Sequence, residues 1–159
     1  MWTFPAVFAL HVLEEAPAFT EWARRHASER YTSDDFIRVN ALGLALTTGT
    51  TLLVVRVPSR RLFLAHYAAV VTQQALFNPV FHAGTTVAFR SYSPGLLTSL
   101  LFVPLWWRLT RLGLRRGLLT RSGVLGASAV GGLVHGSAVA RQVFFLEASS
   151  VFRRAPRPA

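Results

Sequence analysis

Long uncharged apolar runs, separated by short stretches that carry the arginines, are the feature that most constrains this sequence. No Asp, Glu, Lys or Arg occurs within residues 62–89 or 122–140, and arginines cluster at the ends of these runs. A helix needs about 20 apolar residues to cross a bilayer, and only helices and closed barrels satisfy their backbone groups there. The pattern predicts an all-α, polytopic membrane helical bundle.

Length and charge refine this prediction. The chain has 159 residues, of which 52% are hydrophobic and 15% charged. This length suits a single membrane-embedded domain of about five helices. All 17 basic residues are arginine, and they give a net charge of +10. Because they stand at the ends of apolar runs, we expect membrane lipids as partners and no nucleic acid.

The first expected helix is short. Pro5 suits a helix start and Pro17 disfavours a helix interior, which places this helix over residues 4–16. It would be about 20 Å long, less than the ~30 Å of a bilayer's hydrocarbon. The polar segment 20–31 follows, with Trp22 and Tyr31 near its ends. It predicts an interfacial amphipathic helix.

The later helices are bounded by turn and capping residues. Acids at Asp34 and Asp35 follow a capping Ser33, and Asn78-Pro79 predicts a kink or an end. Small residues recur every four positions in two of these helices, which predicts close packing. The expected helices cover residues 36–55, 62 to 78 or 82, 96–112 and 122–147, the two small-residue stripes are Ala41, Ala45, Gly49 and Gly123, Ala127, Gly131, and a loose tail covers 153–159.

Ionisable residues gather near the end of the first helix. Residues three and four apart share a helix face, so His11 lies against both Glu14 and Glu15. If the spans alternate in direction, the third helix brings Asn78 and His82 to the same side of the membrane. We also expect three more polar residues nearby, namely Tyr92, Glu147 and Asn40.

The residue types in this cluster predict a metal site. A His and a Glu from one helix, met by a His from another, are a three-ligand set for zinc or iron with an open position. The predicted metal ligands are His11, Glu14, Glu15 and His82, with His135 and Glu147 as further candidates; Glu14, Glu15 and Tyr92 are the predicted catalytic residues, and Asn78 and Asn40 orient the substrate. The chain has no cysteine, which excludes thiolate ligands and nucleophiles. No nucleotide or haem is expected.

Three roles stay open at this stage. The first is a metal-dependent, hydrolase-like enzyme that acts on a lipid or lipophilic substrate. The second is a small transporter or lipid-binding membrane protein that uses the same carboxylates for proton exchange. The third is structural: the carboxylates bind Arg24, Arg25 or helix N-termini, while His11 and His82 bond between helices.

The order of these residues also resembles a known family. The segment His11-Val12-Leu13-Glu14-Glu15 precedes Phe19 and Trp22, and Asn78-Pro79-Val80-Phe81-His82 and Tyr92-Ser93-Pro94-Gly95 follow later. Together they resemble the bacterial HXXEE membrane-protein family, named for the first motif. The resemblance implies a small polytopic protein of the bacterial cell (inner) membrane and points to the same site residues, without a substrate.

Overall fold

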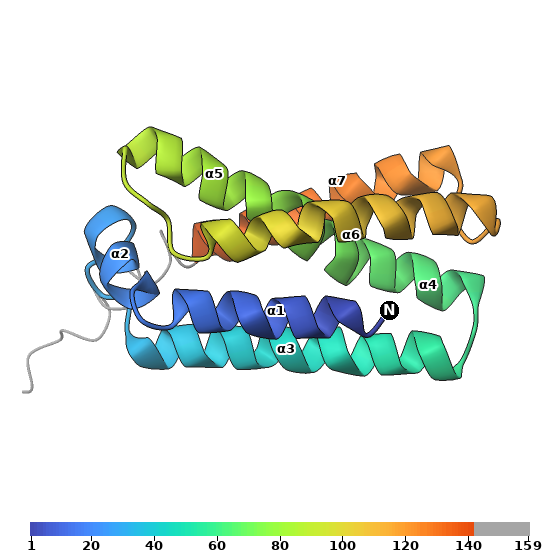
Figure 1. The fold of residues 1–159 in the computed structure, drawn as a ribbon, viewed down its shortest axis with the longest axis horizontal. Coiled ribbons are helices and arrows are strands. Elements are labelled where there is room, and N and C mark those ends of the chain that lie inside the picture. Colours follow the sequence, from blue (N-terminus) through green and yellow to red (C-terminus); the bar gives the residue numbers. More distant parts are fainter. Residues whose placement is uncertain (142–159) are drawn as a thin grey trace, which may run out of the picture.

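The structure is a computed structural model that describes residues 1–141, and every regular element in that range is a helix (Figure 1). The prediction of an all-α bundle with a short first helix is therefore confirmed. The expected tail and Glu147 lie outside the described residues. The elements are α1 (Thr3–Glu15), α2 (Phe19–His26), α3 (Ser33–Arg56), α4 (Arg60–His66), η1 (Tyr67–Val71), η2 (Gln73–Phe77), α5 (Asn78–Phe89), α6 (Leu96–Arg115) and α7 (Arg121–Ala140).

The short helix α1 lies between α3 and α6 and contacts both along its length (Figure 1). Its buried aromatic residues Phe4 and Phe8 join a core that also contains Tyr67 and Phe102. One face of α1 therefore points into the bundle, and His11 lies on that face. Leu13 is 68% exposed and lies on the outer face.

The helix that contains Asn78-Pro79 does not end there. It runs without a break from α4 through two π-helical segments, η1 and η2, into α5. Proline has no backbone N–H and its ring clashes with the carbonyl four residues earlier, and the wider π turns directly precede Pro79. Of the two predicted outcomes, an end at this proline is wrong: Asn78 and His82 stand inside a continuing helix, which ends at left-handed Arg90.

The small residues of α7 pack closely against the π-helical segments. A Cβ added at Gly131 would lie 1.9 Å from the Thr72 hydroxyl, and one added at Gly132 would lie 2.7 Å from the Phe77 ring. The Thr72 hydroxyl also donates to the Ala127 carbonyl at 3.2 Å. The predicted packing role of this helix is confirmed within the described residues.

The corresponding prediction for α3 is wrong. Ala41, Ala45 and Gly49 are exposed, and a Cβ on Gly49 would meet nothing within 4 Å. Instead, α3 packs on α1 through Gly43, where a Cβ would lie 2.9 Å from the Phe8 ring. Buried Thr47 follows one turn later. Small residues occur on two faces of α3, and only the shape of its partner selects one of them.

Two helices are long and apolar enough to cross a membrane, α3 and the Arg121–Val139 part of α7. Both expose large apolar side chains, because Leu42 is 71% and Leu133 is 72% exposed. The helix α2 is amphipathic, as predicted for an interfacial segment. It buries Trp22 and exposes Arg25.

Candidate metal centre

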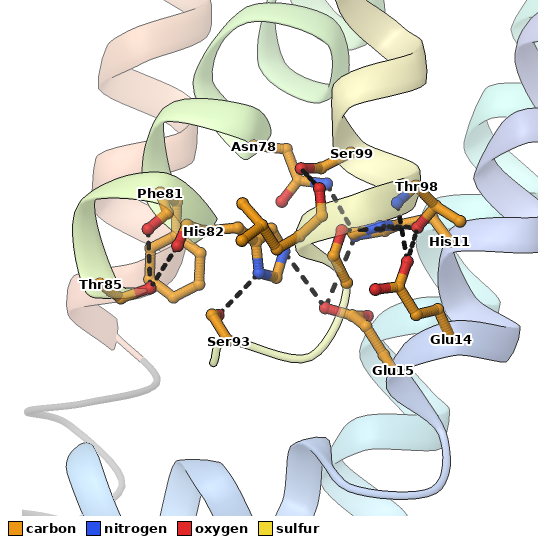
Figure 2. A network of polar contacts seen from close by, with 12 residues as sticks. His11, Glu14, Glu15, Asn78, Phe81, His82, Thr85, Ser93, Thr98 and Ser99 are labelled. Atoms are coloured by element: carbon orange, nitrogen blue, oxygen red, sulfur yellow. Dashed lines mark hydrogen bonds and ion pairs between the residues drawn. The ribbon is translucent and has the colours of Figure 1, made fainter. Parts of the chain in front are cut away.

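Three buried side chains meet where the C-terminal end of α1 faces α5. His11 and Glu15 come from successive turns of α1, and His82 comes from α5 (Figure 2). Their exposed fractions are 2%, 6% and 1%, respectively. One ligand atom from each lies within 4.8 Å of the others, so the triad can hold a metal ion.

Two of the three distances within the triad match tetrahedral coordination. Glu15 Oε1 lies 3.5 Å from His11 Nε2 and 3.4 Å from His82 Nε2. Two ligands at the usual zinc distances of 2.0–2.1 Å, held at a tetrahedral angle, lie about 3.3–3.4 Å apart. Glu15 Oε1 is therefore spaced from each imidazole nitrogen as two ligands of one tetrahedral ion would be.

The Thr98 hydroxyl fixes the orientation of His11. Thr98 Oγ1 lies 3.0 Å from His11 Nδ1 and donates its own proton to Glu14 Oε2. Because that proton is committed to the carboxylate, Oγ1 accepts the N–H of His11 Nδ1. The lone pair of Nε2 then faces Glu15 and His82. Hydrogen bonds to the second ring nitrogen commonly orient histidine ligands of metals in this way.

His82 has a similar arrangement on the other side of the triad. Its Nδ1 lies 2.9 Å from the Ser93 hydroxyl, so Nε2 is the nitrogen that faces Glu15. Asn78, one turn earlier on α5, places its Nδ2 2.8 Å from His11 Nε2. A metal on that nitrogen therefore requires the Asn78 amide to turn aside.

Glu14 points away from the triad and is held by the start of α6. Its two oxygens accept from the backbone N–H groups of Leu97, at 3.2 Å, and Thr98, at 2.7 Å. Helix N-termini favour anions, since their first N–H groups have no partner within the helix. The Tyr92 hydroxyl also donates to Glu14 Oε1. Partial burial and the Glu14 carboxylate raise the pKa of Tyr92, so it stays a donor at neutral pH.

Gly95 closes the triad from the side of α6. Its φ of +98° is in the left-handed region that favours glycine. A Cβ at this position would lie 2.6 Å from His11 Cε1 and 2.9 Å from both Glu15 Cγ and His82 Cε1. The backbone at the N-terminus of α6 therefore packs directly on all three potential ligands.

The triad forms part of the wall of a cavity of about 660 Å³. Small-molecule sites typically occupy about 300–1,000 Å³ and combine apolar walls with a few polar groups. This cavity has both kinds of wall. Among its lining residues are Phe8, Phe19, Trp22, Leu42, Leu46 and Val70, together with the polar Asn40, Gln73, Gln74 and Asn78.

Three other predicted site residues, Asn40, His135 and Glu147, are not part of the triad. Asn40 lies on the cavity wall, and its side-chain amide donates to the Phe36 carbonyl at 3.2 Å. His135 also lines the cavity but lies against the Phe81 ring, at 6.0 Å between centroids, and outside the triad. Glu147 is outside the described residues.

Sequence reasoning missed Thr98, Ser93 and Gly95 as parts of the site. Ser93 and Gly95 lie in the predicted Tyr-x-Pro-Gly turn, so a signal for them existed. Thr98 gave no signal, because a threonine in the first turn of an apolar helix is common.

The residues of this site lie within a segment that matches a known protein family. The family model described as "Protein of unknown function with HXXEE motif" matches residues 2–107. The chain belongs to this HXXEE family. The match includes every residue of the triad and also Glu14 and Thr98, and it ends before α7. Neither the curated proteins nor the solved structures contain a match to the chain.

Proposed function

We propose that this HXXEE protein is an integral membrane enzyme that binds one divalent metal ion through His11, Glu15 and His82. We further propose a hydrolase-like reaction on a lipid or another lipophilic substrate. The observation that carries the proposal is the buried triad, with ligand spacings of 3.4 and 3.5 Å, on the wall of an amphiphilic cavity.

The donor set and its spacing favour zinc over iron. Two imidazoles and one carboxylate serve catalytic zinc sites, and the same set serves non-haem iron. Adjacent ligands in an octahedral iron site lie about 3.0 Å apart, whereas tetrahedral zinc ligands lie about 3.3–3.4 Å apart. The distances from Glu15 Oε1 agree better with zinc. A zinc ion held by these residues would supply a Lewis acid for a carbonyl or phosphoryl oxygen.

The surrounding residues have separate tasks in this proposal. Glu15 is the ligand, because it faces both histidines. Glu14 is a positioning residue, since the start of α6 and Tyr92 already occupy its oxygens. Asn78 turns from His11 toward the substrate and donates to it.

The bilayer location rests on the length and surface of the helices. The apolar outer faces of α3 and α7 would be unfavourable in water and suit lipid. In that setting a buried Glu between two histidines is costly, and such groups usually serve function. We place the protein in the bacterial cell membrane, with the triad facing the bundle interior.

Metal analysis of purified protein tests the metal site. We expect close to one zinc per chain after purification in detergent, and loss of zinc in His11→Ala and His82→Ala. His26→Gln is the matched control, because His26 lies on α2 outside the triad. Variants that remain folded by circular dichroism and still retain zinc contradict the proposal.

Lipid conversion tests the enzymatic part. Nanodiscs of bacterial lipid that contain the zinc-loaded protein should accumulate hydrolysis products detectable by mass spectrometry, and Glu15→Gln should abolish them. Zinc binding without conversion would reject the enzyme and favour the transport alternative. That alternative predicts a pH-dependent flux in liposomes that disappears in Glu15→Gln and does not respond to metal removal.

A further inference from the structure

The cavity beside the triad changes character along α3. Its wall on that helix runs from Arg38 through Asn40 to Leu46. At 1.5 Å per residue, Arg38 and Leu46 stand about 12 Å apart along the helix axis. The order of side chains along this wall therefore defines what kind of molecule the cavity accommodates.

The end near the start of α3 carries positive charge. Arg38 and Arg141 line this end, and within residues 1–141 neither takes part in an ion pair or hydrogen bond. Asp35 also lines it, but its carboxylate already accepts from the Thr32 backbone and hydroxyl at the cap of α3. Guanidinium groups next to an apolar wall favour an anionic group such as a phosphate.

The triad lines the cavity between the charged end and the apolar end. Asn40 stands two residues after Arg38 and lines the same cavity as Glu15. Gln73 and Gln74 from η2 line the same cavity and add amide groups to its wall. A molecule held by Arg38 thus meets polar groups and the potential metal ligands directly beyond its charged end.

The far end of the cavity is apolar. Leu46 and Val70 line it, and Leu42 and Val134 border it from α3 and α7. Leu42, Leu46 and Val134 are 71%, 48% and 44% exposed, whereas Val70 is buried. A hydrocarbon chain can lie along these residues and continue into the surrounding lipid.

We propose that this cavity binds an anionic amphiphile with a phosphate headgroup and a hydrocarbon chain. The phosphate lies at Arg38 and Arg141, and the chain lies along Leu42 and Leu46. The bond that joins head to chain then lies beside the triad. This substrate class rests on the proposed function for the role of the metal, but binding of the amphiphile does not require the metal.

Photolabelling of the purified protein tests the proposal. The probe is a lysophosphatidic acid with a diazirine in its single acyl chain, and the matched neutral probe is the monoacylglycerol with the same chain. We expect labelling of α3 around Leu42 and Leu46, prevented by unlabelled lysophosphatidic acid and not by inorganic phosphate. Competition by inorganic phosphate at similar concentrations would reject the amphiphile in favour of a free phosphate ligand.

Two substitutions separate the contributions of charge and chain. Arg38→Gln should weaken capture of the phosphate probe about tenfold, the size of one lost charged hydrogen bond, without a change for the neutral probe. Leu46→Trp should block both probes. The matched controls are Arg111→Gln and Leu125→Trp, at exposed positions outside the cavity lining.

The outcomes distinguish this inference from the proposed function. Labelling that is spread over lipid-facing residues, or equal for both probes, overturns the inference even if zinc is bound. Two results together would support the amphiphile and overturn the metal-dependent function. The first is a wild-type protein that binds no zinc, and the second is specific labelling that persists in His11→Ala.

Discussion

Glu15 and His82 stand on different helices, yet Glu15 Oε1 and His82 Nε2 lie 3.4 Å apart in the interior of the bundle. The first residue ends α1 and the second stands one turn into α5. Their contact joins two elements that are far apart in the sequence. It also turns a local motif on α1 into a three-residue site, because His11 lies one turn before Glu15.

Loss of the Thr98 hydroxyl should weaken metal binding. Thr98→Val removes the group that accepts from His11 Nδ1 and donates to Glu14. Substitution of such outer partners commonly lowers metal affinity about 10–100-fold. Competition with a chelating zinc indicator measures the change. Tyr92→Phe is the control: it removes one donor to Glu14 and preserves Thr98, so an equal loss in both variants would contradict an orienting role for the hydroxyl.

A side chain at Gly95 should disrupt the triad. In Gly95→Ala the new Cβ would lie within 3 Å of His11, Glu15 and His82, at a backbone angle unfavourable for alanine. We expect loss of bound zinc with helical content retained, measured by metal analysis and circular dichroism. Gly84→Ala, where a Cβ meets nothing within 4 Å, should keep its zinc. Normal zinc content in Gly95→Ala would show that the triad is not the binding site.

The packing of α7 should depend on Gly131. In Gly131→Leu the side chain would overlap Thr72, and overpacking of this kind typically costs about 1–3 kcal/mol. Thermal unfolding in detergent should show a lower midpoint for this variant. Gly126→Leu, at an open position of the same helix, should unfold near the wild-type temperature. Equal midpoints for the two variants would indicate that α7 does not pack on η1 as described.

The absence of cysteine makes the membrane location directly testable. Leu133→Cys should resist a membrane-impermeant maleimide in intact liposomes, because its side chain would face lipid. Arg116→Cys, in the exposed turn after α6, should react from one side of the bilayer. After detergent treatment the Leu133 variant should react faster. Rapid reaction of the Leu133 variant in intact liposomes would exclude the membrane position of α7.

The helices could be predicted because their signals are local. Charge-free apolar runs, and acids after a capping residue, define helices without reference to the rest of the fold. The cap of α3 is Thr32, one residue before the predicted Ser33, and the acids Asp34 and Asp35 lie in the first turn as expected. The helix containing Pro79 was predicted less well, since the adjoining π turns depend on packing along the whole helix.

The sequence by itself determined that His11 shares a helix face with two carboxylates, because helical periodicity brings positions three and four residues apart together. It did not determine which carboxylate faces His82, since Glu14 and Glu15 point about 100° apart around the same helix. Only the tertiary structure decided this. The start of α6 places two backbone N–H groups and the Thr98 hydroxyl beside Glu14, and α5 brings His82 to Glu15. Adjacent residues of one motif are thereby assigned to different tasks, one to orient His11 and the other to complete the triad.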